Sequence, residues 1–191
     1  MQKFLLFLFI IFSISCSSNN AENAITIEPQ KVLGQSVNSE TFNKFFSTFL
    51  NDYYKLKDAF VKEDTAVINA SAKQIQISVD SLKLNELKAD SLIIKTAKLY
   101  VSNLSDELKG LVKETDINNK RKSFQIVTSD MYDIIRTVKF DREKVYLQHC
   151  PMAFKNTGAD WLSNSNEIVN PYLPKMMIDC GVLKDSIDFR N

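Results

Sequence analysis

Between residues 39 and 140, apolar residues recur every three or four positions, with charged and polar residues between them. This spacing places the apolar side chains on one face of a helix, and it predicts four helices. The helices are expected to begin near Ser39, Asp64, Asp90 and Asp116, with the last ending near Val138. The predicted buried stripes are, in chain order, Phe42, Phe45, Phe46, Phe49, Tyr53, Leu56 and Phe60; Ile68, Ala72, Ile75, Val79 and Leu82; Ile93, Ala97, Tyr100, Leu104, Leu108 and Leu111; and Phe124, Val127, Met131, Ile134, Ile135 and Val138.

Short connections between these helices favour antiparallel neighbours. The expected fold is therefore mostly α, an antiparallel up-down four-helix bundle over residues 39–140. A hydrophobic content of 45% is enough for a real core, and only four Gly interrupt the chain. The aromatic stripe that starts at Phe42 is interpreted as core, because such stripes far more often pack inside a protein than line a ligand pocket.

The pattern changes after Phe140, where turn residues and Pro appear. Residues 141–191 are expected to form an irregular segment that packs on the bundle, so that residues 39–191 make one domain. Within this segment, the alternation from Lys144 to Gln148 predicts a short strand. Pro174 suits the first turn of a short helix and Gly181 its C-terminal cap, so a short helix is predicted between them.

The N-terminus has the features of a bacterial lipoprotein signal. A positively charged flank at Lys3 precedes an unbroken apolar run from Phe4 to Phe12, which is too short to span a membrane. Small residues then lead to Cys16, as in a lipobox, although Ser13 stands where Leu is more usual. Residues 1–16 are interpreted as a signal peptide with Cys16 as the lipidation site, and the polar residues 17–38 as a flexible tether. The protein is thus expected to be exported and membrane-anchored, on the periplasmic side or at the outer membrane. The alternative is an ordinary secretory signal in which Cys16 is incidental.

Soft and borderline metal ligands are concentrated near the C-terminus. The segment contains the single His149 and the single Trp161, and its sulfur residues are Cys150, Met152, Met176, Met177 and Cys180. In an extended segment Cys150 and Met152 point to one side, while on the predicted short helix either Met can share a face with Cys180. Thiolate and thioether sulfur, with one imidazole as a possible addition, suit Cu(I), and Ag(I) would follow it.

Two other readings of the same residues stay open at this point. In an oxidising compartment, Cys150 and Cys180 can form a disulfide with the Met residues as core filler, and spacing alone favours neither this nor a metal site. Zinc would need a further ligand such as Asp179, and calcium or magnesium is not indicated where sulfur rather than oxygen is concentrated.

Charge and motif content argue against two large classes of function. The net charge is +1 and no basic run exceeds Lys120-Arg121-Lys122, so nucleic-acid binding is not expected. The chain has one His, no nucleophile elbow, no phosphate loop and no Cys-x-x-Cys pair, so no enzymatic activity is expected.

The C-terminal motifs resemble those of a bacterial domain family of unknown function, number 3347. They are the runs His149-Cys-Pro-Met-Ala-Phe154, Gly158-Ala-Asp-Trp-Leu-Ser163, Glu167-Ile-Val-Asn-Pro-Tyr172 and Met176-Met-Ile-Asp-Cys-Gly181. The resemblance covers roughly Phe42 to Leu183. It implies a helical bundle followed by this tail, in small exported proteins and in C-terminal extensions of periplasmic adaptors of copper and silver efflux pumps. By that resemblance the candidate metal ligands are Cys150, Met152, Met176, Met177 and Cys180, with His149 as a possible sixth.

Two functions follow from the residues and the resemblance together. The leading hypothesis is a membrane-anchored periplasmic protein that binds Cu(I) or Ag(I), either to buffer copper or to hand it to an efflux system. The alternative is a non-catalytic interaction module of an efflux system, stabilised by a Cys150–Cys180 disulfide.

Overall fold

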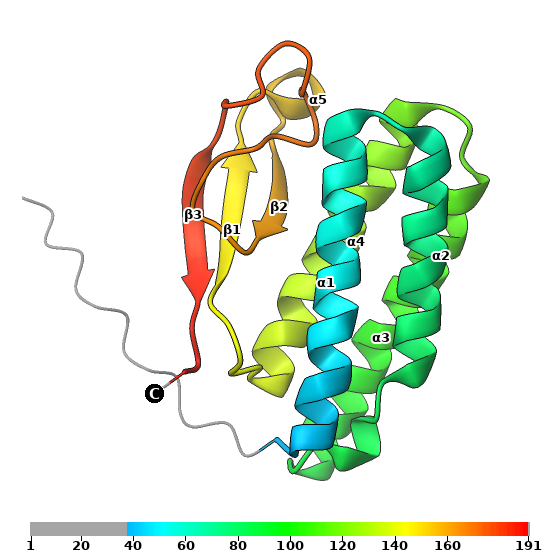
Figure 1. The fold of residues 1–191 in the computed structure, drawn as a ribbon, viewed down its shortest axis with the longest axis vertical. Coiled ribbons are helices and arrows are strands. Elements are labelled where there is room, and N and C mark those ends of the chain that lie inside the picture. Colours follow the sequence, from blue (N-terminus) through cyan, green and yellow to red (C-terminus); the bar gives the residue numbers. More distant parts are fainter. Residues whose placement is uncertain (1–37, 191) are drawn as a thin grey trace, which may run out of the picture. The chain divides into compact units, whose positions relative to one another are not determined.

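The computed structural model describes residues 38–190, and within them the predicted helical bundle is confirmed. The long helices are α1 (Glu40–Lys62), α2 (Thr65–Ser81), α3 (Ser91–Lys113) and α4 (Ile117–Val138), with a 3₁₀ turn η1 (Leu84–Glu86) before α3 (Figure 1). The expectations for the signal peptide, for Cys16 and for nearly all of the tether fall on residues outside this description. No helix among the described residues is long and apolar enough to cross a membrane.

Each long helix begins where a short polar side chain can cap it. The Ser39 hydroxyl accepts a hydrogen bond from the backbone N–H of Phe42, and Asp64, Asp90 and Asp116 cap α2, α3 and α4 in the same way. Such a cap satisfies backbone donors that have no partner inside the helix. The sequence therefore sets the helix starts locally, before any tertiary contact forms.

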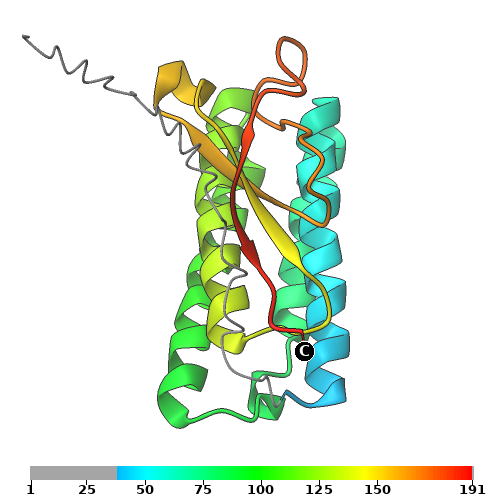
Figure 2. The same ribbon diagram turned by 90° about the vertical axis from the view of Figure 1, so that its left-hand side faces the viewer.

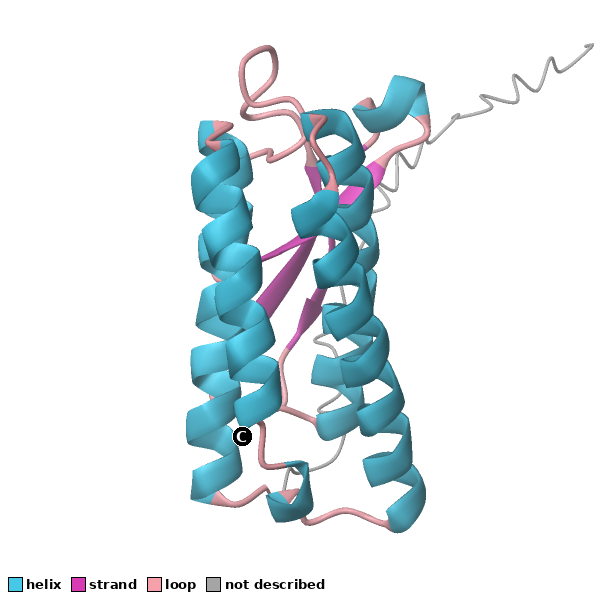
Figure 3. Cartoon of the chain, turned by 90° about the vertical axis from the view of Figure 1, so that its right-hand side faces the viewer, coloured by secondary structure: helices cyan, strands magenta, loops and turns pink. Residues whose placement is uncertain are grey.

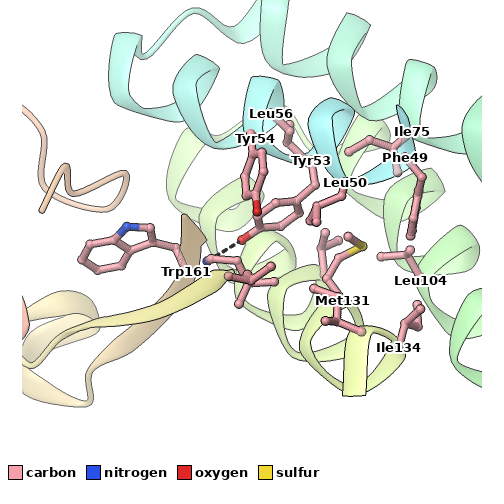
Figure 4. Close-up of a cluster of buried hydrophobic side chains, with 14 of the residues drawn as sticks. Phe49, Leu50, Tyr53, Tyr54, Leu56, Ile75, Leu104, Met131, Ile134 and Trp161 are labelled. Carbon is pink, nitrogen blue, oxygen red and sulfur yellow. Dashed lines mark hydrogen bonds between the residues drawn. The ribbon is translucent and has the colours of Figure 1, made fainter. Parts of the chain in front are cut away.

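The core of the bundle follows the predicted stripes closely. On α1 the side chains of Phe42, Phe46, Phe49, Tyr53 and Phe60 are fully buried, and Met131 of α4 lies in the same cluster (Figure 4). Among the predicted core residues, Leu82, Ile93 and Tyr100 are only partly buried, as is Phe45. Phe45 lies beneath the ammonium group of Lys83, 5.7 Å from the ring centroid.

A three-stranded antiparallel sheet follows the bundle, in the order β2-β1-β3. The strands are β1 (Val145–Cys150), β2 (Ala159–Ser163) and β3 (Val182–Ile187). In Figure 1 the sheet lies beside α1 and α4, and in Figure 3 the strands are seen behind the helices. The strand predicted from Lys144 to Gln148 is thus confirmed, but two further strands form where the prediction had an irregular segment.

The predicted short helix between Pro174 and Gly181 is wrong. Residues 171–180 form bends and turns, and Gly181 directly precedes β3. The reason is the buried side chain of Asn170, whose Oδ1 accepts from the backbone N–H groups of Tyr172 and Leu173 and whose Nδ2 donates to the carbonyl of Cys180. The backbone N–H of Asn170 also donates to the carbonyl of Ile178 at 2.7 Å. Asn170 thus ties the start of the segment to its end, and the loop closes on itself instead of continuing as a helix.

The sheet is joined to the bundle through Tyr53. The hydroxyl oxygen of Tyr53 accepts from the backbone N–H of Leu162 at 3.0 Å and shares a hydrogen bond with the hydroxyl of Thr128 at 2.7 Å. Burial raises the pKa of Tyr53 well above its usual value, which keeps this hydroxyl neutral. The side chain of Trp161 points away from the helical cluster (Figure 4). One face of β2 therefore packs on the bundle, and the other faces the segment around Gly181.

A carboxylate on α4 gives the fold a pH dependence. Burial, with smaller contributions from Asp133 and Glu107, raises the pKa of Asp130 to about 6, and its Oδ2 is buried without a hydrogen-bond partner among the described residues. Because the folded-state pKa lies above the unfolded value near 3.8, ionised Asp130 destabilises the fold above pH 6. The penalty disappears as the pH falls below about 4.

We therefore expect Asp130→Asn to raise the free energy of unfolding by about 1–2 kcal/mol at pH 7.5, after allowance for solvent screening of a partly exposed group. Urea denaturation at pH 7.5 and at pH 4 measures this, and the gain should vanish at pH 4. Asp106→Asn, at an exposed carboxylate paired with Lys109, is the matched control and should stay within about 0.5 kcal/mol. An Asp130→Asn protein that is less stable at pH 7.5 would contradict the assignment.

Candidate functional site

The thiols of Cys150 and Cys180 lie close together in the folded C-terminal segment, residues 141–190, which we call the tail. Cys150 is the last residue of β1 and is fully buried, whereas Cys180 lies two residues before β3 and is partly exposed. Antiparallel pairing of β1 with β3, which sets His149 opposite Val182, brings the Sγ atoms to 3.9 Å from each other across thirty residues of sequence. Both are free thiols. We call residues 149–152 the first arm and residues 176–181 the second arm.

The second arm is held in place by close packing around Gly181. A Cβ atom at this position would lie 2.8 Å from Cη2 of Trp161 and 3.1 Å from the carbonyl oxygen of His149. Real Cβ atoms essentially never come within 3.0 Å of another heavy atom, so only glycine lets the chain pass this close to β1. Together with the bond from Asn170 to the Cys180 carbonyl, this contact fixes the position of the second thiol.

The loop that carries the second arm is also docked on the end of the bundle. Arg121 donates from Nε to the carbonyl of Pro171 at 3.1 Å and pairs with Glu63 at 2.7 Å, and Lys175 pairs with the same carboxylate. These two cations hold the pKa of Glu63 below its usual value. The ion pairs therefore connect α1, α4 and the loop of the second arm into one unit.

The first arm ends in an unusual turn. The four-residue α5 (Ala153–Asn156) contains Phe154 and Lys155 in the left-handed region, Asn156 follows with φ of 69°, and Gly158 has φ of 87°. Left-handed backbone costs roughly 1–2 kcal/mol for each non-glycine residue, so packing must hold the turn. The ring of Phe154 packs edge-on against Tyr172, with centroids 5.5 Å apart. The turn reverses the chain directly after Cys150 and so exposes the arm at the end of the sheet.

A second glycine is required beside this turn. A Cβ at Gly158 would lie 2.6 Å from Cε1 of the His149 ring, and its φ is unfavourable for any other residue. We expect Gly158→Ala to lower the free energy of unfolding by about 2–3 kcal/mol in urea denaturation. Gly110→Ala, in α3 with nothing within 4 Å of the added methyl, is the control and should instead raise it by about 0.5–1 kcal/mol. Equal effects of the two changes would contradict the tight contact with His149.

His149 belongs to a different group of side chains. Its Nδ1 lies 2.6 Å from Oδ1 of Asp160, and Oδ2 of Asp160 lies 2.7 Å from the ammonium of Lys184. Neighbouring strand residues point to opposite faces of a sheet, so the imidazole and the Cys150 thiol are on opposite sides of β1. The structure thus joins His149 to a charged row across the sheet rather than to the sulfurs.

The predicted Met positions lie on the arms and near the surface. Met152 and Met176 are exposed, the latter to 74%, and Met177 is partly buried. Neither Met152 nor Met176 is therefore core filler. Within residues 38–190, no group of three or more His, Cys, Asp and Glu side chains is arranged to hold a metal, so Asp179 does not complete a zinc set.

The thiol pair suits a soft ion by distance and by chemistry. A separation of 3.9 Å is less than twice a metal–sulfur bond of about 2.3 Å, so one ion can reach both sulfurs. Partial burial, the Cys150 thiol and the Asp179 carboxylate together raise the pKa of Cys180, so without metal this thiol is protonated at neutral pH. A metal that binds here must displace protons, which favours ions with high affinity for thiolate.

Sequence reasoning found the thiols but missed the residues that position them. Asn170 and Gly181 fix the second arm, and Gly158 makes room for His149. The sequence offers one indication of their role. Asn170 precedes a Pro and Gly181 follows Cys180, and such Pro and Gly positions are typical of turns and loops. Which groups they contact depends on strand pairing, and the sequence pattern does not show it.

Fold and site together define a class: a four-helix bundle domain with a small antiparallel sheet that carries a thiol pair at one end. Residues 49–143 match the profile of a family described as Protein of unknown function (DUF3347), so the chain contains a domain of this family, as its motifs predicted. The matched range runs from within α1 to just before β1, so both arms lie beyond it. Searches among curated proteins and among solved structures gave no significant match.

Proposed function

We propose that this protein binds Cu(I), with Ag(I) as a mimic, through the thiolates of Cys150 and Cys180, and that it has no catalytic role. The observation that carries the proposal is the 3.9 Å separation of two free thiols from arms thirty residues apart. One sulfur is fully buried and the other partly exposed, so the pair combines a fixed ligand with an accessible one.

This asymmetry supports exchange of the ion rather than permanent storage. An acceptor can approach Cys180 from solvent and replace it as a ligand before Cys150 is released. Met152, Met176 and Met177 lie on the same arms and offer thioether sulfur, which stabilises Cu(I) but is a poor ligand for zinc. The thiol pair is therefore suited to buffering Cu(I) or handing it over.

The place of this activity follows from the N-terminal sequence and the family resemblance. The run that ends at Cys16 supports export and lipid anchoring, with residues 17–38 as the tether. The resemblance to domains carried by efflux adaptors suggests such an adaptor as the acceptor. We propose a membrane-anchored protein on the periplasmic side or at the outer membrane.

The test is a competition titration. A soluble form that begins at Ser17 is reduced, loaded with Cu(I) in the presence of a chromogenic Cu(I) chelator, and assayed for bound copper and for thiols open to alkylation. We expect one Cu(I) per chain and protection of both thiols. If the chelator keeps all the copper and alkylation is unaffected, the proposal is wrong.

The same geometry favours a second candidate, an interaction module with a structural disulfide. Closing the sulfurs from 3.9 Å to a bond of about 2.05 Å needs only a small movement of the arms. Such a bond across thirty residues would add about 3–4 kcal/mol to stability. Thiol counting on protein purified without reductant distinguishes the two: two thiols per chain support the metal site and none supports the disulfide.

A further inference from the structure

The end of the sheet that carries the thiols has an exposed apolar surface. Its members lie on the two arms, and we call them the tail tip: Met152, Met176 and Ile178. In Figures 1 and 2 α5 and the loop before β3 stand at the same end of the described domain. The two arms adjoin at their thiols, and exposed apolar side chains gathered on adjoining segments are typical of a surface that another molecule covers.

The proposed copper site is accessible from solvent through Cys180, which is partly exposed and lies two residues after Ile178. Each chain supplies two thiols, and among the described residues no third His, Cys, Asp or Glu converges on them. Cu(I) commonly accepts a further sulfur ligand, and the most exposed sulfur of the tail tip belongs to Met176. A ligand from outside the chain can therefore complete the site.

The charges around the tail tip favour a second copy of this chain as the partner. Lys175 and Lys184 are paired within the chain, to Glu63 and Asp160. Two exposed charges are left beside the arms, Lys155 after the first and Asp179 within the second. A two-fold axis that runs between the arms would set the acidic arm of one copy against the basic arm of the other, and the apolar groups against each other.

We propose that the tail tip is a self-association surface: Cu(I) held by Cys150 and Cys180 of one copy takes the Met176 thioether of a second copy as a further ligand, which gives a copper-dependent homodimer. This inference rests on the proposed Cu(I) binding. Because the interface is closed by metal, the reduced metal-free chain is monomeric.

Sedimentation velocity of the soluble form, with and without one equivalent of Cu(I), tests the proposal. We expect the apparent mass to double on loading. Ile178→Lys places a charge in the apolar interface, so it should bind one Cu(I) but remain monomeric. Met176→Leu keeps the apolar surface and removes the sulfur, so the loaded dimer should dissociate at least about 10-fold more readily.

A charge exchange tests the two-fold arrangement. Asp179→Lys should weaken the loaded dimer, and Lys155→Asp added to it should restore the dimer, because the exchanged charges again meet across the axis. Failure of the restoration overturns the arrangement. A loaded chain that binds copper but stays monomeric overturns the dimer and assigns the tail tip to a different protein, while the Cu(I) site stands. A chain that takes no copper overturns both.

Discussion

Cys150→Ser/Cys180→Ser is expected to lower the affinity for Cu(I) by at least about 100-fold. Loss of a group that merely supports a ligand typically costs 10- to 100-fold in metal affinity, so loss of both ligands exceeds that range. Each single variant should lose most of this affinity, because two sulfurs 3.9 Å apart act on one ion. The competition titration with the Cu(I) chelator measures the change.

His149→Asn is the matched control for this series. The imidazole is held by Asp160 on the other side of β1, so its removal should change the Cu(I) affinity by less than about 10-fold. The comparison of the two sets of variants locates the metal. If His149→Asn abolished Cu(I) binding while the Cys150 and Cys180 variants bound copper normally, the metal would lie at the charged row instead of at the arms.

Trp161→Ala is expected to lower the free energy of unfolding by about 3–5 kcal/mol, the largest effect on stability predicted for the tail. The side chain is fully buried, and Gly181 passes directly over its ring. Loss of the ring leaves a cavity where the second arm should pack, so Cys180 should also lose its fixed position. Urea denaturation measures the stability, and the chelator titration should show weaker Cu(I) binding under conditions where the variant remains folded.

Leu99→Ala serves as the control for the tryptophan change. This residue is 60% exposed on α3, so its truncation should alter the free energy of unfolding by less than about 0.5 kcal/mol. A tryptophan variant that is no less stable than this control would mean that the tail does not pack on β2 as described.

The bundle was predictable because its determinants are local. Polar caps at Ser39, Asp64, Asp90 and Asp116 set the helix starts, and a 3.6-residue period specifies the buried face without reference to distant residues. The family was also recognised from short motifs, although the profile matches the bundle and the motifs that carried the resemblance lie after it.

The tail was harder to predict because its structure depends on long-range pairing. β1 pairs with β3 across more than thirty residues, and the turns before β3 depend on the buried amide of Asn170. Pro174 and Gly181 carry helix-end signals, but Gly181 is needed for the close pass over Trp161 instead. Tertiary contacts such as these override the local helix propensity of the segment.

The concentration of sulfur in two segments motivated the hypothesis that the two arms could close on each other, and the thiols do lie 3.9 Å apart. It could not place His149, because which face of β1 a residue occupies is set by one position of register. Cys150 and His149 are neighbours in sequence, yet the strand separates their side chains. Of the six residues named from the sequence, His149 thus lies on the side of β1 opposite the Cys150 thiol.

The account rests on the claim that Cys150 and Cys180 together hold Cu(I). Copper K-edge X-ray absorption of the soluble form, loaded with one equivalent of Cu(I), tests it most directly. We predict a first shell of sulfur alone at about 2.2–2.3 Å, lost in Cys150→Ser/Cys180→Ser. A shell of nitrogen and oxygen, unchanged in that variant, would contradict the account.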